Sequence, residues 1–134
     1  IVYPVFPGAL EFVDSLRQAG MKTVIVTSSD DKKMEFLFRQ HPGFKEHFDA
    51  IVTAADVTRS KPDPEPYLIG ARKVGCDASE CVVFEDSFQG LEAGRRAGSH
   101  VIALATTNPA ASLEGKADRI VYSLAELAGD ISKL

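Results

Sequence analysis

Three short polar segments follow apolar stretches of the sequence and together could bind a phosphate group and a metal ion. The first is Thr27-Ser28-Ser29, which follows a β-branched run. Hydroxyl groups and free backbone amides at the start of a helix form an anion site, because the amides and the helix dipole both favour negative charge. An ordinary helix cap would explain one of these hydroxyls. The segment therefore indicates either a phosphate site or a helix cap.

The second segment contains a lysine whose backbone is restricted. Lys61 is followed by Pro62, and a residue before proline is held in extended conformations. This restriction would keep the ammonium group of Lys61 on a defined path. The alternative is an exposed loop lysine, which is the commoner case for a single lysine.

The third segment is a pair of carboxylates. Glu85 and Asp86 directly follow the apolar sequence Cys-Val-Val-Phe. Adjacent carboxylates at the end of a buried strand repel each other and are costly to remove from water. A hard cation such as Mg²⁺ relieves both problems. Alternatively, Asp86 or Ser87 caps the next helix and Glu85 reaches solvent.

Helices and strands must alternate along the chain to position these segments. Apolar periodicity and helix-start and helix-stop residues predict helices over 8–19, 31–40, 65–74 and 87–97, and a final helix from 124. β-branched runs predict strands over 21–27, 48–53, 81–85, 100–105 and 119–122. This alternation predicts an α/β protein with a Rossmann-like parallel sheet and helices on both faces. Ligands bind such sheets at the carboxyl ends of the strands, where all three polar segments lie. Together they suit phosphoryl transfer.

Composition places the chain among ordinary globular domains. The 134 residues carry a net charge of −4, with 45% hydrophobic and 25% charged residues, and we expect one domain over 1–134. Nothing in this charge balance favours nucleic acid or a membrane as a partner. Cys76 and Cys81 lack metal-ligand spacing, so we expect free thiols. These thiols and the absence of a leader pattern favour a cytoplasmic location.

Three stretches of sequence resemble motifs of the haloacid dehalogenase superfamily of phosphotransferases. They are most similar to its β-phosphoglucomutase and sugar- or glycerol-phosphate phosphatase branch. The stretches that carry the resemblance to the second, third and fourth motifs are VIVTSSD (24–30), SKPDPEPYLIGARKVG (60–75) and VVFEDSFQGLEAGRRAG (82–98).

The resemblance implies a role for each candidate residue. It implies that the hydroxyl of Thr27 and the backbone amide of Ser28 bind phosphate. Lys61 would pair with the phosphate and with the nucleophile. Asp86 would be a ligand of Mg²⁺, and Glu85 beside it a direct or water-mediated one.

The first motif of that superfamily, Asp-x-Asp-Gly-Thr, is absent from the 134 residues. It would supply the nucleophilic and acid-base aspartates on the central strand. We therefore expect a core that lacks its first, central strand and its cap domain. Strands 23–27 and 81–85 would then have unpaired backbone groups in a buried layer, which is costly. Our hypothesis is that an N-terminal segment of the same protein fills this place. Direct pairing of the two strands, at about 4.8 Å, would make it wrong.

These observations lead to an expected function. The complete protein would be a Mg²⁺-dependent phosphatase of a small phosphorylated metabolite such as a sugar phosphate. An aspartate outside this chain would form an aspartyl-phosphate, so we expect little or no turnover from the chain alone. One alternative is a β-phosphoglucomutase-like isomerase. Another is a non-catalytic module that binds phosphate and metal.

Overall fold

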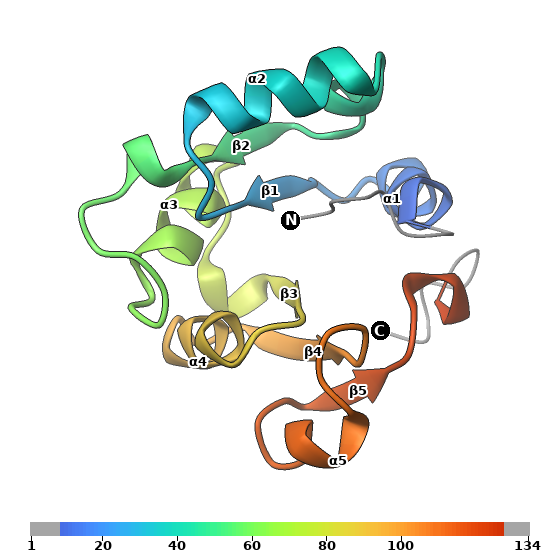
Figure 1. Ribbon diagram of the computed structural model, residues 1–134, viewed down its shortest axis with the longest axis vertical. Helices are drawn as coiled ribbons and strands as arrows, with labels where there is room; N and C mark the ends of the chain where they lie inside the picture. Colours follow the sequence, from blue (N-terminus) through green and yellow to red (C-terminus); the bar gives the residue numbers. More distant parts are fainter. Residues whose placement is uncertain (1–8, 128–134) are drawn as a thin grey trace.

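The computed structural model describes residues 9–127, in which helices alternate with short parallel strands (Figure 1). The helices are α1 (Ala9–Gln18), α2 (Asp31–Gln40), α3 (Glu65–Lys73), α4 (Phe88–Arg96) and α5 (Ala110–Leu113). The strands are β1 (Val24–Val26), β2 (Ala50–Val52), β3 (Val82–Glu85), β4 (His100–Leu104) and β5 (Arg119–Val121). The predicted α/β alternation is confirmed.

Most predicted boundaries are close to those observed, with two kinds of difference. The predicted strands over 21–27 and 48–53 are three residues long in the structure. The predicted final helix is a 3-10 turn, η4 (Leu124–Glu126), and position 128 lies outside the described residues, as does position 8 of the first predicted helix.

The described strands form two separate parallel sheets. β1 pairs with β2, in the register Val24↔Ala50. β3 pairs with β4, and β4 with β5. No pairing joins β1 to β3 within residues 9–127. The prediction that these two strands do not pair directly is therefore confirmed.

A cavity of about 490 Å³ separates the two sheets. Apolar side chains of both unpaired strand edges line it, with further apolar residues from α1. Its lining includes Phe12, Val13, Leu16, Val24, Ile25, Val26, Val82, Val83 and Phe84. The open edges of β1 and β3 therefore face a shared apolar space.

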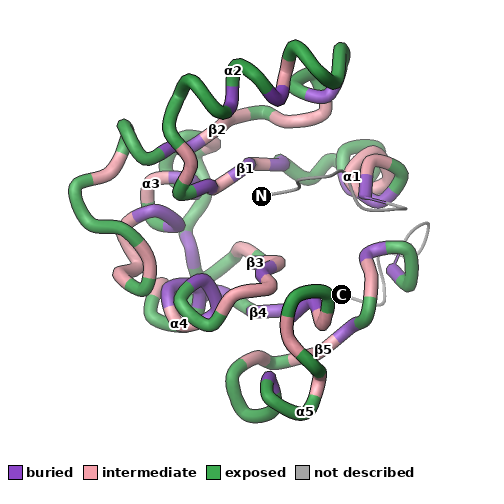
Figure 2. Tube along the Cα trace, viewed as in Figure 1, coloured by how far each residue is buried: buried purple, intermediate pink, exposed green. Residues whose placement is uncertain are grey.

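Helices cover both faces of the strands, as predicted. On one face, α3 contacts β1 and β2, α4 contacts β3 and β4, and α3 contacts α4. On the other face, α1 packs Phe12 and Leu16 against Ile102 of β4, and α2 packs Leu37 against Ile25 of β1. Buried positions therefore line the inner sides of these elements (Figure 2).

The described residues show three further features of the sequence. Cys76 and Cys81 are free, with Cys76 exposed. The Nδ1 atom of His47 lies 2.6 Å from the Oδ1 atom of Asp14. None of the described helices is long and apolar enough to cross a membrane. The cytoplasmic location stays a prediction.

Candidate active site

The structure buries Lys61 at the carboxyl ends of β1 and β3. Its Nζ atom lies 2.9 Å from Oε2 of Glu85 and donates a hydrogen bond of 3.2 Å to the carbonyl oxygen of Val26. The side chains of Lys61 and Glu85 are only 10% and 7% exposed. The alternative of an exposed loop lysine is therefore wrong. The ammonium bridges the two separate sheets.

Glu85 accepts hydrogen bonds at both of its carboxylate oxygens. The hydroxyl of Tyr67, on α3, donates to Oε2 at 2.6 Å. The backbone amides of Asp86 and Ser87 donate to Oε1 at 3.1 and 3.2 Å, and the hydroxyl of Ser87 donates to it at 3.1 Å. Glu85 therefore does not reach solvent, and that part of the alternative is wrong. Its other part is confirmed, because Ser87 caps α4 and its hydroxyl accepts from the amide of Gly90 at 3.0 Å.

Glu85 is ionised at neutral pH in spite of its burial. Burial alone would raise its pKa, but the Lys61 ammonium and hydrogen bonds from Tyr67 and Lys61 outweigh that effect and lower the pKa to about 2. Burial, and then the Glu85 carboxylate, raise the pKa of Tyr67 well above its ordinary value. Tyr67 therefore keeps its proton and remains a donor.

Asp86 follows Glu85 in the sequence, and one of its two carboxylate oxygens accepts a hydrogen bond within the described residues. Its Oδ2 atom accepts a hydrogen bond of 2.6 Å from the hydroxyl of Thr107. Within residues 9–127 no hydrogen bond reaches Oδ1. A half-buried carboxylate with one oxygen of this kind fits a ligand of Mg²⁺.

Glu85 fits the role of a water-mediated ligand of Mg²⁺ better than that of a direct one. Its two oxygens already accept from one ammonium, two hydroxyls and two amides. Of the two predicted modes, these contacts favour the water-mediated one. The described part of the chain has no group of three or more potential metal-binding side chains. A complete Mg²⁺ site therefore needs further oxygen ligands from water, substrate or other polypeptide.

The segment at the end of β1 is not used to cap α2. Asp30 is the cap, and its carboxylate accepts from the amide of Lys33 at 2.9 Å. The hydroxyl of Thr27 accepts from the amide of Ser29 at 3.1 Å. Thr27 is 5% exposed, whereas Ser28 is exposed. The helix-cap alternative for these three hydroxyls is therefore wrong, and their role in phosphate binding stays a prediction.

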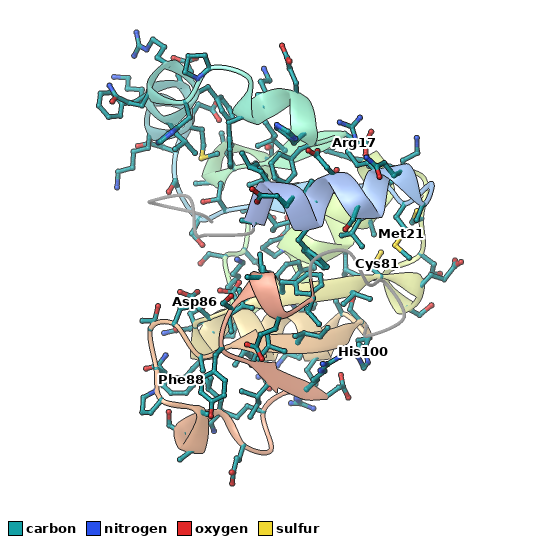
Figure 3. The ribbon with its side chains drawn as sticks, turned by 90° about the vertical axis from the view of Figure 1, so that its right-hand side faces the viewer. Arg17, Met21, Cys81, Asp86, Phe88 and His100 are labelled. Carbon is teal, nitrogen blue, oxygen red and sulfur yellow. The ribbon has the colours of Figure 1, made fainter. Side chains whose placement is uncertain are left out.

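Figure 3 shows on which side of the molecule Asp86 lies. Asp86 and Phe88 lie on one side, and Cys81 and His100 lie on the opposite side. Because β3 runs from Val82 to Glu85 and is parallel to its neighbour, this side is the carboxyl edge of the sheet. Lys61 lies at this edge as well, because its ammonium contacts Glu85 and the carbonyl oxygen of Val26.

Sequence reasoning missed Tyr67 as a member of this site. Tyr67 is one of the four buried residues of α3, with Pro66, Gly70 and Ala71, and their helical spacing indicates one buried face. A buried tyrosine hydroxyl usually needs a hydrogen-bond partner, so the sequence did contain a signal. The identity of that partner depends on how α3 packs against β3.

Gly90 leaves the space that Glu85 occupies. A β carbon at Gly90 would lie 2.0 Å from Cδ of Glu85. We expect Gly90→Ala to lower the free energy of unfolding by about 3 kcal/mol, because the buried carboxylate must move and lose its hydrogen bonds. Denaturant unfolding of the wild-type protein and the variant measures this change.

Gly94 of the same helix is the matched control. A β carbon there would lie 3.1 Å from methyl groups of Val83 and Val101, and alanine also favours the helix by about 1 kcal/mol. We therefore expect Gly94→Ala to cost about 1 kcal/mol or less. Equal losses for the two variants would contradict the role given to Gly90.

Comparison with known proteins shows to which protein family the chain belongs. Residues 2–98 match the family model of haloacid dehalogenase-like hydrolases. The chain belongs to this family of hydrolases, which confirms the resemblance seen in its motifs.

The chain spans about one third of the length of one curated relative and about half of another. It is 32% identical over 121 residues to the bifunctional riboflavin kinase/FMN phosphatase of Arabidopsis thaliana, covering 90% of this chain and 32% of that protein. It is 36% identical over 123 residues to hexitol phosphatase A of Escherichia coli, covering 90% of this chain and 55% of that protein.

Solved structures show the same fold. CbbY from Rhodobacter sphaeroides in complex with phosphate superposes with a TM-score of 0.79 at 30% identity, over 90% of this chain and 55% of that one. A putative β-phosphoglucomutase from Thermotoga maritima gives a TM-score of 0.83 at 26% identity, over 96% and 60%. The predicted fold class is therefore confirmed.

Proposed function

We propose that the complete protein is a Mg²⁺-dependent phosphatase that hydrolyses a small phosphorylated metabolite, such as a sugar phosphate. The observation that carries this proposal is the buried pair of Lys61 and Glu85, 2.9 Å apart at the sheet edge beside Asp86. A fixed ammonium next to acidic residues suits an oxygen-rich anion together with a cation. The named activities of the phosphatase relatives support the same class of reaction.

Lys61 retains a donor for the substrate. An ammonium has three N–H donors, and Glu85 and the carbonyl of Val26 take two of them. The third would bind a phosphoryl oxygen, together with the hydroxyl of Thr27 and the amide of Ser28. These donors would hold the phosphoryl group in line for attack.

Asp86, and Glu85 through a water molecule, would hold Mg²⁺. When bound, the ion supplies positive charge that offsets the negative charge on the phosphoryl oxygens. Glu85 also fixes the position of Lys61, since its Oε2 atom accepts from both Lys61 and Tyr67.

The nucleophile would come from an aspartate outside this chain. Its carboxylate oxygen would bond to phosphorus as the bond from phosphorus to the substrate oxygen breaks, and the acid-base aspartate of the same absent motif would give its proton to the leaving oxygen, which departs as an alcohol. Water would then cleave the aspartyl-phosphate, which releases inorganic phosphate and restores the carboxylate.

The place for that aspartate is the cavity between the sheets. We propose that a strand from an N-terminal segment of the same protein lies there and pairs with both β1 and β3. The unpaired edges and the apolar lining of the cavity support this, because an apolar strand would satisfy the backbone groups of both edges. A strand parallel to its neighbours would end at the carboxyl edge, beside Lys61 and Asp86.

The test is an assay of the full-length protein against a panel of phosphate monoesters in the presence of Mg²⁺. Release of inorganic phosphate is the expected result. Conversion of β-glucose 1-phosphate to glucose 6-phosphate without released phosphate would overturn the proposal and favour an isomerase. An isomerase is the second candidate function, because one structural neighbour is a putative β-phosphoglucomutase. Phosphate binding without turnover of any ester would indicate a non-catalytic binding module.

A further inference from the structure

Two residues that follow β4 hold Asp86 from the side. The hydroxyl of Thr107 donates to Oδ2 of Asp86 at 2.6 Å, and the side-chain amide of Asn108 donates to the backbone carbonyl of Asp86 at 3.2 Å. Both residues lie between β4 and α5, 21 and 22 residues further along the chain than Asp86. The proposed function gives neither of them a role.

These contacts fix Asp86 at three points. Besides the two bonds from Thr107 and Asn108, its own amide donates to Oε1 of Glu85 at 3.1 Å. The backbone and one carboxylate oxygen are therefore held, while Oδ1 has no hydrogen bond within residues 9–127. A carboxylate held in this way presents one oxygen in a defined direction.

We propose that Thr107 and Asn108 are positioning residues that orient Asp86 for cation binding. This inference rests on the Mg²⁺ site of the proposed function. Hydrogen bonds that orient a metal ligand commonly change metal affinity by 10–100-fold. The rival explanation is that the contacts only close the loop after β4. Thr107 is exposed, and an exposed hydrogen bond adds little to stability because water competes for both partners. Loop closure is therefore a weak explanation for this bond.

The test is calorimetric titration of the full-length protein with Mg²⁺ alone, without substrate. We expect Thr107→Val to raise the Kd for Mg²⁺ by about 10–100-fold, and Asn108→Ala to raise it as well. Thr107→Ser keeps the hydroxyl and is expected to restore the affinity. Thr106→Val is the matched control, since Thr106 is the exposed neighbour and no hydrogen bond of its hydroxyl is found in the described part of the chain.

Three outcomes would overturn the inference. An unchanged Kd for Thr107→Val, with the wild-type protein binding Mg²⁺, overturns it and leaves the proposed function intact. A lower melting temperature for Thr107→Val with an unchanged Kd shows loop closure only, and also overturns it. A wild-type protein that does not bind Mg²⁺ overturns both the inference and the Mg²⁺ dependence of the proposed function.

Discussion

Replacing Lys61 with alanine in the full-length protein is expected to lower kcat/KM for a phosphate monoester by about 10²–10³-fold. The ammonium is held by Glu85 and by the carbonyl of Val26, so it needs no reorganisation when negative charge develops on the phosphoryl group. Alanine at this position leaves no donor there. Steady-state kinetics of phosphate release measure the effect.

The same substitution also affects stability, and the two effects must be separated. Without Lys61, the buried carboxylate of Glu85 loses its ion pair, which typically costs about 3 kcal/mol or more. The double variant Lys61→Ala/Glu85→Gln removes the unpaired charge. We expect it to regain part of the free energy of unfolding while its kcat/KM stays low.

Lys73 provides the matched control. Its Nζ atom donates to the carbonyl oxygen of Ile51 at 3.0 Å and lies 3.6 Å from Oδ2 of Asp56. It therefore has the same kinds of partner as Lys61, but it is 38% exposed. We expect Lys73→Ala to change kcat/KM by less than about threefold. A similarly small effect for Lys61→Ala would contradict the role given to Lys61.

The position of the polar residues at the strand ends could be predicted from the sequence, because each of them directly follows a short apolar run. Short β-branched runs end at Val26 and Glu85, and parallel strands bring their carboxyl ends to one edge. The contact between Tyr67 and Glu85 joins residues 18 positions apart and depends on the packing of α3. Local periodicity predicts that Tyr67 is buried but does not identify the group that its hydroxyl contacts.

The predicted strands were too long because composition does not show where a strand stops pairing. Thr23 is β-branched and buried, so it fits a strand by residue type. Its amide, however, donates to the carboxylate of Asp49 at 2.8 Å, and its hydroxyl donates to the carbonyl of His47 at 2.8 Å. The amide of Asp49 still donates to the carbonyl of Thr23 at 2.7 Å, so side-chain contacts replace only the ladder bond that the Thr23 amide would make at the amino end of β1.

The 134-residue chain alone is expected to show no phosphate release above background, a loss on the order of 10⁵-fold or more relative to the full-length protein. The reason is chemical: in the proposed function Lys61 and Thr27 bind the phosphoryl group and Asp86 binds Mg²⁺, but the sequence lacks the Asp-x-Asp-Gly-Thr motif that would supply the nucleophile. The assay uses purified chain free of longer species. Robust phosphatase activity from that sample would contradict the prediction.

Supplying the proposed N-terminal segment as a separate polypeptide is the converse experiment, and it tests where the nucleophile belongs. If the segment adds a strand between β1 and β3, their backbone amides gain partners, and hydrogen exchange at Val24–Val26 and Val82–Glu85 is expected to slow as activity appears. An aspartate-to-asparagine change in that strand is the matched control, because it keeps the pairing and removes the nucleophile. Slow exchange without activity is then expected. Activity with unchanged exchange at both edges would place the nucleophile elsewhere, and the cavity of about 490 Å³ would need another occupant.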